Sequence, residues 1–332
     1  IIWLKQFTVH EKGRFPLMLT IRNLSHDPFY NQAFEEYIYQ TFPDDDIFFL
    51  WQNSPAVVVG SYQNICREVH VEALRRLGIP VVRRMTGGGT VYHDLGNVNY
   101  TYIVRTDGGW NYDDVLAPVI AALNAIGVPA QKNRVCDIAI GDLKISGSAQ
   151  RIVKGRLLHH GTLLFSTDLR VLDQITTHRK NDCFQSRGTQ SAICTVTNIR
   201  EHLASPMTIE EFQDRLLGQM VPPGSPHLTL TAEQEAEVCR LRDEKYRSWE
   251  WTWGKTPAFT YEKSGSFRGA PIRVAYQAKR GIVSDAVIDC AAIDGALAAQ
   301  LLSGSRLDPE GFAEVCRRLA GDGAEELMDW LM

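Results

Sequence analysis

Apolar and polar residues recur along this chain with two periods, one typical of helices and one typical of strands. The segments with helical spacing begin at capping signals such as Ser25 or Asp27 ahead of Pro28, and they end at glycines such as Gly78 and Gly127. The predicted helices cover 28–42, 67–77, 113–126, 209–220, 232–246, 293–302 and 309–319. Short apolar runs predict strands at 19–22, 47–51, 56–59, 81–84, 98–104, 272–277 and 281–289.

Turn residues indicate which of these strands pair. Asn53-Ser-Pro55 supplies a turn between 47–51 and 56–59, so we expect a hairpin there and not a βαβ unit. Runs of strands with helices between them indicate an α+β fold with a mixed sheet. The turns at Gly141-Asp142 and Lys154-Gly155 predict an antiparallel meander over 139–145, 149–153 and 156–165.

A change of pattern after residue 247 divides the chain into a large and a small domain. Single cores stop growing at roughly 250–300 residues, and this chain has 332. The segment 248–257 breaks the helical period, ends in a proline and carries three alternating tryptophans, Trp249, Trp251 and Trp253, that resemble one face of a strand packed at the junction. We predict a tail or expression-derived segment at 1–17, a large domain at 18–247, a linker at 248–263 and a small C-terminal α+β domain at 264–332, with two strands followed by two helices.

The composition excludes several classes of protein. Hydrophobic residues make up 44% of the chain and charged residues 22%, which argues against disorder, collagen and coiled coils. The 35 basic against 39 acidic residues give a net charge of −4, so we expect no nucleic acid as partner. No apolar run approaches the roughly 20 residues that span a membrane, so we expect no membrane partner either. Seven scattered cysteines without a C-x-x-C pair fit a reducing cytoplasm.

The strongest chemical signal is a run of three glycines directly after a predicted strand, in Arg83-Arg84-Met-Thr-Gly-Gly-Gly-Thr90. Glycines allow the backbone to approach a ligand and to turn several N–H groups toward one anion. The two arginines add fixed positive charge and donors suited to phosphate or carboxylate. The run matches neither G-x-x-x-x-G-K-[ST] nor G-x-G-x-x-G, so P-loop and Rossmann chemistry lose their main support. The plain alternative is a tight glycine turn beside surface arginines.

A second signal is a lysine within a predicted strand. If Leu143 and Ile145 face the core, alternation places Lys144 and Ser146 on the other side, where the ammonium can project into a cleft. There it could stabilise charge that develops on an α-phosphate or a carbonyl. Asp137 lies on the preceding strand, and a carboxylate near phosphates most often holds Mg²⁺. A solvated Lys–Asp surface pair is the alternative.

Taken together, these segments resemble the bacterial lipoate–protein ligase A family. The ordered motifs that carry the resemblance lie at 83–97, 144–150, 159–164 and 245–251. The resemblance runs from about Met18 to the C-terminus and includes the small tail domain of the two-domain members. It implies a fold shared with biotin ligases, a central mixed β-sheet flanked by helices, in which lipoate and ATP bind in one cleft of a catalytic domain at 18–247.

The resemblance also implies a two-step reaction. Lipoate and Mg·ATP give lipoyl-adenylate and pyrophosphate, and a lysine of an acceptor protein then attacks the acyl carbonyl to form an amide. The implied acceptors are lipoyl-domain proteins, namely the E2 subunits of 2-oxoacid dehydrogenases and the H protein of glycine cleavage. Lys144 falls on the family's essential lysine, which contacts the lipoyl carbonyl and the α-phosphate.

The other candidate residues are carried over from the family by position. Asp137 is the implied Mg²⁺ ligand, but Cys136 stands where the family has Asn, and Ser61 stands where it has a basic residue. The residues implied to line the lipoyl pocket are Gly60, His93, His160 and Gly161. The residues implied to bind ATP or lipoyl-adenylate, besides Lys144, are Arg83, Arg84, Thr86, Gly87, Gly88, Gly89, Thr90, Tyr92, Asp137, Ser148 and Ala149.

Other functions of the same fold compete with this hypothesis. A lipoyl or octanoyl transferase would work without ATP-dependent activation, either through a thiolate, for which Cys136 lies nearest to a motif, or from ready-made lipoyl-adenylate. A passive lipoyl-binding protein would not need Arg84 and Lys144, and the Gly-Arg-Gly-x-x-Gly-Arg type loop of biotin ligases is absent. His159 and His160 are neighbours on a predicted strand, so they point to opposite faces and cannot hold one metal together.

Overall fold

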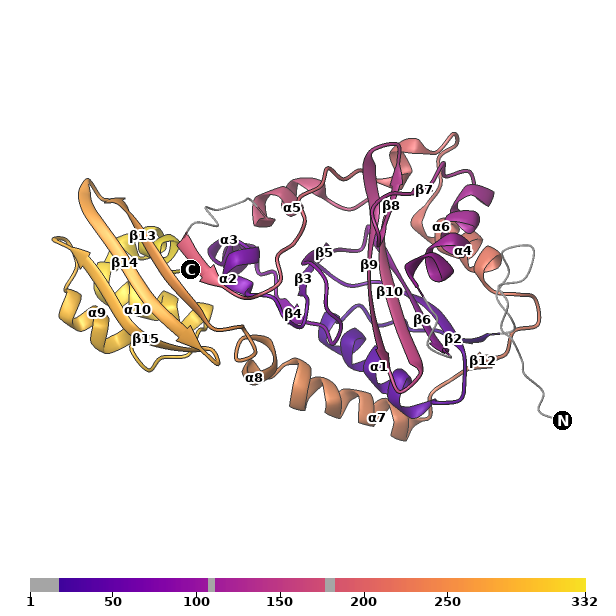
Figure 1. The fold of residues 1–332 in the computed structure, drawn as a ribbon, viewed down its shortest axis with the longest axis horizontal. Helices are drawn as coiled ribbons and strands as arrows, with labels where there is room; N and C mark the ends of the chain where they lie inside the picture. The colour runs from indigo at the N-terminus through magenta and orange to yellow at the C-terminus, as the bar shows by residue number, and fades with distance from the viewer. Residues whose placement is uncertain (1–17, 107–110, 177–182) are drawn as a thin grey trace. The chain divides into compact units, whose positions relative to one another are not determined.

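The computed structural model describes residues 18–106, 111–176 and 183–332 (Figure 1). The chain forms two compact units, and it passes between them several times. The first unit comprises the chain up to residue 54 together with 93–169 and 193–242, and the second comprises 55–92, 170–192 and 243–332. The tail predicted at 1–17 lies outside the described residues.

A mixed sheet forms the centre of the first unit. Among the described residues it has eight strands in the order β12-β1-β2-β6-β10-β9-β8-β7. Strand β1 is parallel to β2 and β12, and the remaining pairs are antiparallel. The strands are β1 (Leu19–Ile21), β2 (Ile47–Trp51), β6 (Asn97–Arg105), β7 (Gln131–Lys132), β8 (Asp137–Ile140), β9 (Leu143–Val153), β10 (Arg156–Leu164) and β12 (His227–Leu228). The predicted α+β class with a central mixed sheet is confirmed.

Helices cover both faces of this sheet (Figure 1). On one face, α1 (Pro28–Thr41) begins where the Asp27 carboxylate accepts hydrogen bonds from two backbone N–H groups, and α7 (Ala232–Leu241) packs beside it. On the other face, α4 (Tyr112–Ala125) and α6 (Ile209–Met220) each begin with a capping box. Their apolar side chains form one core with residues of β2, β6, β9 and β10.

The second unit contains two further sheets. Strand β3 (Ala56–Val59) lies between β4 (Val81–Arg83), to which it is parallel, and β5 (Val91–His93). The other sheet has the order β11-β13-β14-β15 and is antiparallel. Its strands are β11 (Phe184–Ser186), β13 (Phe259–Phe267), β14 (Ala270–Lys279) and β15 (Ile282–Cys290).

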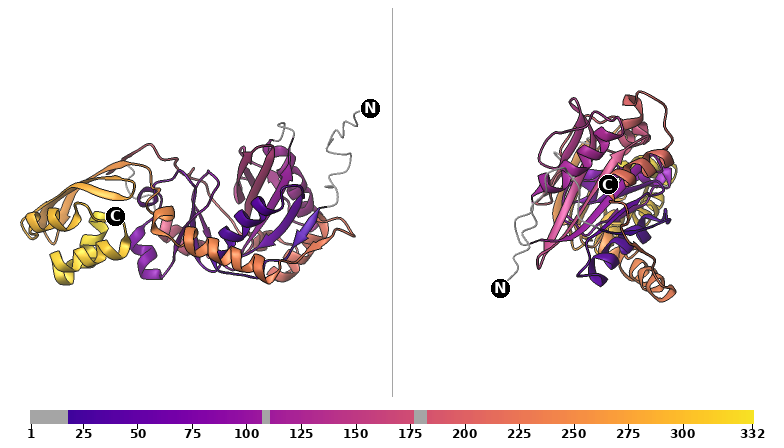
Figure 2. Two further views of the ribbon diagram at one scale, coloured as in Figure 1. Left: turned by 90° about the horizontal axis from the view of Figure 1, so that it is seen from below. Right: turned by 90° about the vertical axis from the view of Figure 1, so that its right-hand side faces the viewer.

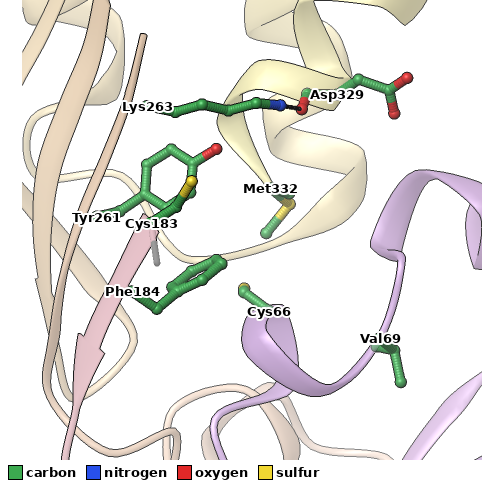
Figure 3. A pocket seen from close by; sticks show the side chains of 8 residues that line it. All are labelled: Cys66, Val69, Cys183, Phe184, Tyr261, Lys263, Asp329 and Met332. Atoms are coloured by element: carbon green, nitrogen blue, oxygen red, sulfur yellow. Dashed lines mark hydrogen bonds between the residues drawn. The ribbon is translucent and has the colours of Figure 1, made fainter. Parts of the chain in front are cut away.

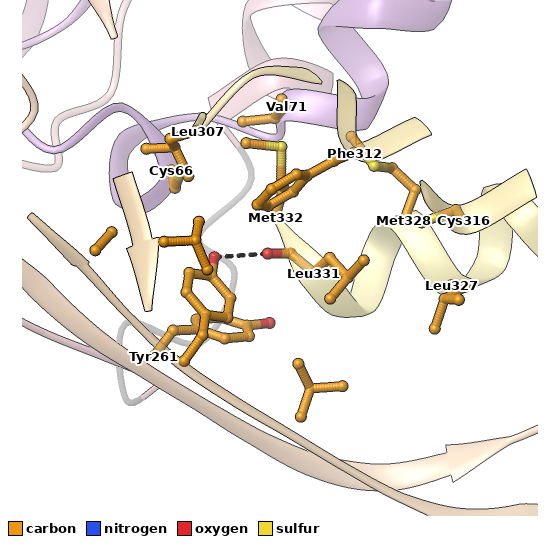
Figure 4. Close-up of a cluster of buried hydrophobic side chains, with 14 of the residues drawn as sticks. Cys66, Val71, Tyr261, Leu307, Phe312, Cys316, Leu327, Met328, Leu331 and Met332 are labelled. Atoms are coloured by element: carbon orange, nitrogen blue, oxygen red, sulfur yellow. Dashed lines mark hydrogen bonds between the residues drawn. The ribbon is translucent and has the colours of Figure 1, made fainter. Parts of the chain in front are cut away.

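One apolar core holds the second unit together. Helices α9 (Gly295–Leu302), α10 (Pro309–Ala320) and α11 (Ala324–Leu331) lie along one face of the antiparallel sheet (Figure 2). Their side chains share this core with Tyr261 of β13, with Cys66 of α2 (Ile65–Glu68) and with Val71 of α3 (Val71–Leu77) (Figure 4). The unit also contains α5 (Leu169–Thr176), apart from its first residue, and α8 (Trp249–Thr252).

Four predictions of local structure are wrong. The hairpin over 47–59 does not form, because β2 and β3 belong to different sheets. The helix over 67–77 is broken, because the His70 ring accepts a hydrogen bond from the Ala73 N–H and starts α3 anew. The 248–253 segment is not strand-like, since Ser248 caps the short helix α8. The C-terminal part is more than two strands and two helices, because β11, β13 and α11 join it.

No helix in the described ranges is both long and apolar enough to cross a membrane.

Local pattern predicts a linker at 248–263, whereas the second compact unit also includes 55–92 and 170–192. The division into domains at 18–247, 248–263 and 264–332 stays a prediction.

Candidate functional site

The glycine run forms a loop that closes around the side chain of Arg84. One guanidinium nitrogen of Arg84 donates to the carbonyls of Gly87 and Gly89, both at 2.6 Å. Another donates to the Val58 carbonyl at 3.0 Å, and Nε donates to the Thr86 hydroxyl at 3.0 Å. In a planar trans peptide the N–H points opposite to the carbonyl, so the N–H groups of Gly88 and Thr90 point away from Arg84. The motif therefore folds around a buried cation and directs these two N–H groups away from it.

Gly60 and Gly88 are glycines for geometric reasons. A Cβ at Gly60 would lie 2.3 Å from the Gly88 carbonyl oxygen, and Gly88 has a φ of 83°, which side chains rarely adopt. The glycine loop therefore occupies the space that a side chain at Gly60 would need. Close approach of backbone to backbone explains the residue type at Gly60 before any ligand is considered.

Arg83 lies behind the loop and is completely buried. Its guanidinium donates to the carbonyls of Gly60 at 2.8 Å, Gln63 at 3.0 Å and Thr252 at 2.8 Å, and to the Thr256 hydroxyl at 3.3 Å. Among the described residues, no carboxylate pairs with it. Burial, and next the charge of Arg84, lower the pKa of Arg83 to about 10. Arg83 is thus a buried cation held by backbone dipoles, and it does not present its donors to solvent.

Two residues that the sequence analysis missed complete the loop. The Ser191 hydroxyl accepts hydrogen bonds from the Thr90 N–H at 2.8 Å and from the Gln63 amide at 3.1 Å. Glu68 accepts from both the hydroxyl and the backbone N–H of Ser191, and burial raises the pKa of this carboxyl. Neither residue lies in a recognised motif, so no sequence signal could have identified this contact.

In the first unit, Lys144 and Asp137 form a partly buried ion pair. The Lys144 ammonium lies 2.9 Å from an Asp137 carboxylate oxygen, and the two side chains are 23% and 7% exposed. A Cβ at Gly147 would lie 2.9 Å from the Lys144 nitrogen, so the absence of a side chain there leaves room for the ammonium. The Lys144 N–H donates to the Thr195 carbonyl, and the Lys144 carbonyl accepts from the Thr197 N–H. The strand therefore holds the Lys144 ammonium beside Asp137.

The predicted alternation around Lys144 is wrong, because a β-bulge interrupts it. Ser146 pairs with Ile138 and Lys144 pairs with Ala139, so Ile145 is the extra residue. Ile145 and Ser146 are both fully buried, whereas Lys144 lies on the side of Asp137 and Gly147. The bulge thus moves Lys144 off the face that Ser146 occupies. Single-sequence periodicity cannot detect an extra residue of this kind.

The surroundings of Asp137 restrict what can bind there. The Cys136 sulfur lies 3.6 Å from the Asp137 carboxylate, and burial, followed by the charge of Asp137, raises the pKa of this thiol. No cluster of three or more His, Cys, Asp or Glu suited to a metal occurs in the part of the chain that the structure describes. A single carboxylate fits Mg²⁺ only when phosphates and water supply the other ligands.

Buried hydrogen bonds and one ring contact connect His93 with His160. The His160 Nδ1 lies 2.8 Å from the Glu35 carboxylate, which accepts from the Thr101 hydroxyl at 2.8 Å. The Trp51 indole donates to the same hydroxyl, and its ring meets the His93 ring edge to face at 5.9 Å. The structure thus brings these two predicted residues together, with Glu35, Thr101 and Trp51 between them. The sequence analysis placed none of these three.

The other residues of this group have their own contacts. A Cβ at Gly161 would lie 2.4 Å from the Tyr100 hydroxyl, so this glycine makes room for a tyrosine ring on the face opposite to His160. His159 stacks on Tyr100 with 6.0 Å between ring centroids. Burial, and next the charge of His160, lower the pKa of His159 to about 3. The prediction that the two adjacent histidines point to opposite faces is confirmed.

Three further candidates lie at the edges of these groups. The Ser148 hydroxyl donates to the Cys136 carbonyl at 2.9 Å. Ala149 is buried opposite His160 in the sheet. Tyr92 is part of the apolar core of the second unit. Residues 60, 83, 84, 86–90 and 92 therefore belong to the second unit, and residues 93, 137, 144, 148, 149, 160 and 161 belong to the first.

A separate cavity of about 260 Å³ lies in the second unit (Figure 3). Its walls include Cys66, Phe184, Tyr261 and Met332, and the Lys263 ammonium at its edge donates to the Asp329 carbonyl at 2.7 Å. None of the residues predicted for the site lines it. The cavity is therefore distinct from both groups of candidate residues.

Comparison with known proteins points to one family. The model of the lipoyl protein ligase A/B catalytic domain matches residues 27–221. The chain is 35% identical to lipoate–protein ligase 1 of Staphylococcus aureus, over 79% of this chain and 81% of that protein. It is 34% identical to the lipoate–protein ligase LplJ of Bacillus subtilis, over 82% and 84%. A crystal structure of lipoate–protein ligase A bound with ATP is similar, with a TM-score of 0.58, 25% identity and coverage of 72% and 98%.

Proposed function

Because this chain belongs to the lipoyl protein ligase A/B family, we propose that its two groups of candidate residues catalyse the ATP-dependent attachment of lipoate to protein. The chain is a lipoate–protein ligase, and the resemblance found in its sequence is confirmed. ATP and lipoate are its substrates. The observation that carries the proposed site is the Lys144–Asp137 pair, with the opening that Gly147 leaves beside it.

In the first step, a carboxylate oxygen of lipoate attacks the α-phosphorus of ATP, and pyrophosphate leaves with the electrons of the broken P–O bond. This brings one anion against another, so the site must supply positive charge. We assign this role to the Lys144 ammonium, which the bulge at Ile145 and the bonds to Thr195 and Thr197 hold in place. In the second step, the amine of an acceptor lysine attacks the acyl carbonyl, AMP leaves, and the amine gives up a proton.

The glycine loop is the proposed cradle for the phosphate groups of ATP and lipoyl-adenylate. Its support is the Gly88 N–H, which points away from the Arg84 cation, while the Thr90 N–H is held by the Ser191 hydroxyl. Backbone donors that are already oriented need no reorganisation when charge develops. Thr86, Gly87, Gly89 and Tyr92 belong to this loop and its following strand, and Ser148 and Ala149 complete the proposed set beside Lys144.

We place the lipoyl chain along His93 and His160. The support is the buried Trp51 ring between them and the Glu35 carboxylate that fixes the His160 ring. The Trp51 and His93 rings supply apolar area, which suits an apolar acyl chain. The lipoyl-pocket role expected for Gly60 and for Gly161 stays a prediction, because the glycine loop and the Tyr100 ring fill the space that each leaves.

Mg²⁺, the acceptors and the compartment are further parts of this proposal. The Asp137 carboxylate would hold Mg²⁺ together with phosphates, and the ion would supply charge neutralisation at those phosphates. The acceptors are lipoyl-domain proteins, the E2 subunits and the glycine cleavage H protein. A cytoplasmic location fits seven cysteines that are all free thiols.

Lipoate-dependent exchange of labelled pyrophosphate into ATP tests the proposal, because only an enzyme that forms lipoyl-adenylate reversibly catalyses it. We expect exchange with the wild type and a loss of roughly 10²- to 10³-fold with Lys144→Ala. Lys144→Arg should not restore it, since a planar guanidinium is not a compact ammonium. Absence of exchange in folded wild type would contradict the ligase.

Cys136→Ser separates the ligase from the thiol transferase. The raised pKa of Cys136 disfavours a thiolate, so we expect this variant to keep most of the ATP-dependent ligation. Intact-mass analysis of the wild type with lipoate and ATP should show no thioester. A stoichiometric thioester that disappears together with turnover in Cys136→Ser would favour the transferase instead.

A further inference from the structure

We infer that Trp251 and Arg83 are positioning residues that hold the glycine loop from behind, and that the segment after the large domain thereby contributes to ATP binding. The inference deepens the proposed function, on which it rests. It assigns a role in ATP binding to the tryptophan-rich segment 248–257, which the sequence pattern indicates as packing at a domain junction. All of the contacts that carry it lie within the second unit.

Trp251 fixes the peptide bond that joins the two arginines. Its indole N–H donates to the Arg83 carbonyl at 2.7 Å. The N–H of the same peptide, which belongs to Arg84, donates to the Val59 carbonyl at 3.0 Å. A peptide bonded on both sides cannot rotate, so the direction in which the Arg84 side chain leaves the strand is set.

Two cations lie over the Trp251 ring. The Lys245 ammonium lies 4.0 Å from the ring centroid, and the Lys255 ammonium lies 3.7 Å from it. Ammonium groups at these distances are attracted by the ring quadrupole. Lys245 precedes α8 and Lys255 follows it, so cations from both flanks of this helix contact the indole.

The Arg83 side chain joins the same segment to the residues that precede the glycine loop. Its guanidinium joins the Gly60 and Gln63 carbonyls, which precede the glycine loop, to the Thr252 carbonyl and the Thr256 hydroxyl, which follow Trp251. A buried cation that is held only by carbonyls and a hydroxyl is costly, and loss of its partners would leave it unsatisfied. Loss of the Arg83 contacts should therefore also disturb the glycine loop that surrounds Arg84.

Trp249 provides a matched control for Trp251. It lies in the same short helix, its indole N–H also donates to a backbone carbonyl, that of Leu307 at 3.0 Å, and a cation, Arg306, also lies over its ring at 4.5 Å. Its hydrogen bond leads to the C-terminal part of the unit and not to the glycine loop. Trp249→Phe and Trp251→Phe thus remove the same kind of bond from two ends of one helix.

Calorimetry with ATP alone, on the full chain, tests the inference without requiring turnover. We expect Trp251→Phe to weaken ATP binding by roughly fivefold, the factor that corresponds to one net hydrogen bond. Trp249→Phe should bind ATP like the wild type, even if its melting temperature falls by as much as that of Trp251→Phe. In steady state, Trp251→Phe should raise the KM for ATP and leave the KM for lipoate unchanged. Arg83→Lys should show a larger effect of the same kind.

Equal ATP affinities of the two tryptophan variants, whether both are unchanged or both are weakened, would overturn the inference. If Arg83→Lys does not fold, the tryptophan pair still decides the question. Wild type that binds ATP but shows no pyrophosphate exchange would contradict the proposed function and leave this comparison valid. Wild type that does not bind ATP would contradict both.

Discussion

At the scale of single residues, small changes of volume and charge decide the chemistry. Lys144 can reach Asp137 only because Gly147 has no side chain, and Tyr100 can occupy its place only because Gly161 has none. His159 remains neutral because the protein interior does not solvate an imidazolium. Each of these effects can be changed by one substitution.

Gly147→Ala tests the room that Lys144 requires. The new methyl group would lie 2.9 Å from the Lys144 nitrogen, which is the flexible end of a side chain, so the ammonium should move and the sheet should not. Because misplacement by about 1 Å can cost as much as 10²-fold, we expect pyrophosphate exchange to fall by roughly 10- to 100-fold. The melting temperature should be close to that of the wild type. Full activity in this variant would remove Lys144 from the proposed role.

His159 makes the stability of the protein depend on pH. The folded pKa is about 3, whereas an unfolded histidine has a pKa of about 6.5. The unfolded chain therefore takes up a proton between these values that the folded chain does not, so stability is full above about pH 6.5 and decreases as the pH falls toward about 3. Between about pH 3 and pH 6.5, the free energy of unfolding from urea titrations should depend on pH less steeply in His159→Phe than in the wild type, by about 1.4 kcal/mol per pH unit. An unchanged slope would show that the folded protein protonates His159.

At the scale of elements, irregular features of strands and loops determine where side chains and backbone N–H groups point. The bulge at Ile145 sets the direction of Lys144, and the trans peptides of the glycine loop direct N–H groups away from Arg84. Both features depend on pairing between segments that are distant in the chain. They belong to the sheet and the loop as wholes and not to one residue.

Substitutions at Gly60 and Gly87 distinguish a glycine required for backbone packing from one that has open space around it. A methyl group at Gly60 would lie 2.3 Å from a backbone oxygen that cannot move without the loop, whereas a methyl group at Gly87 would have its nearest neighbour at 3.9 Å, on the Tyr62 ring. We expect Gly60→Ala to lower the free energy of unfolding by about 1–3 kcal/mol. Gly87→Ala should change it by less than about 0.5 kcal/mol. Equal stabilities in chemical denaturation would contradict the close approach of Gly60 and Gly88.

At the scale of the whole molecule, the chain builds its second unit from distant segments. Val57, Ile65 and Leu74 share one apolar core with Phe259, Tyr276 and Phe312. The loop that binds the anion in our proposal therefore rests on a core that the C-terminal residues complete. The division predicted from the sequence, with a linker at 248–263 and an accessory domain at 264–332, implies instead that the glycine loop folds without the C-terminal residues.

Truncation after Lys255 distinguishes these two possibilities. Because the core of 55–92 would lose its apolar partners, we expect limited proteolysis to cut the truncated chain within α2 and α3, at sites that are protected in the full chain. Binding of ATP to the fragment should be lost as well. A fragment that resists proteolysis and binds ATP like the full chain would support the predicted domain boundary.

The sequence by itself determined the class of fold, most helices and strands, and the motifs of the ligase family, because periodicity, capping residues and short motifs act over a few neighbouring positions. It also indicated Lys144, Asp137 and the glycine loop as chemically important. Only the tertiary structure decided that β2 and β3 lie in different sheets, that Lys144 leaves the face of Ser146, and that Arg83 is buried among carbonyls. Strand partners, an extra residue in a ladder and the partners of a buried cation depend on residues up to about half the chain away, and local pattern carries no information about them.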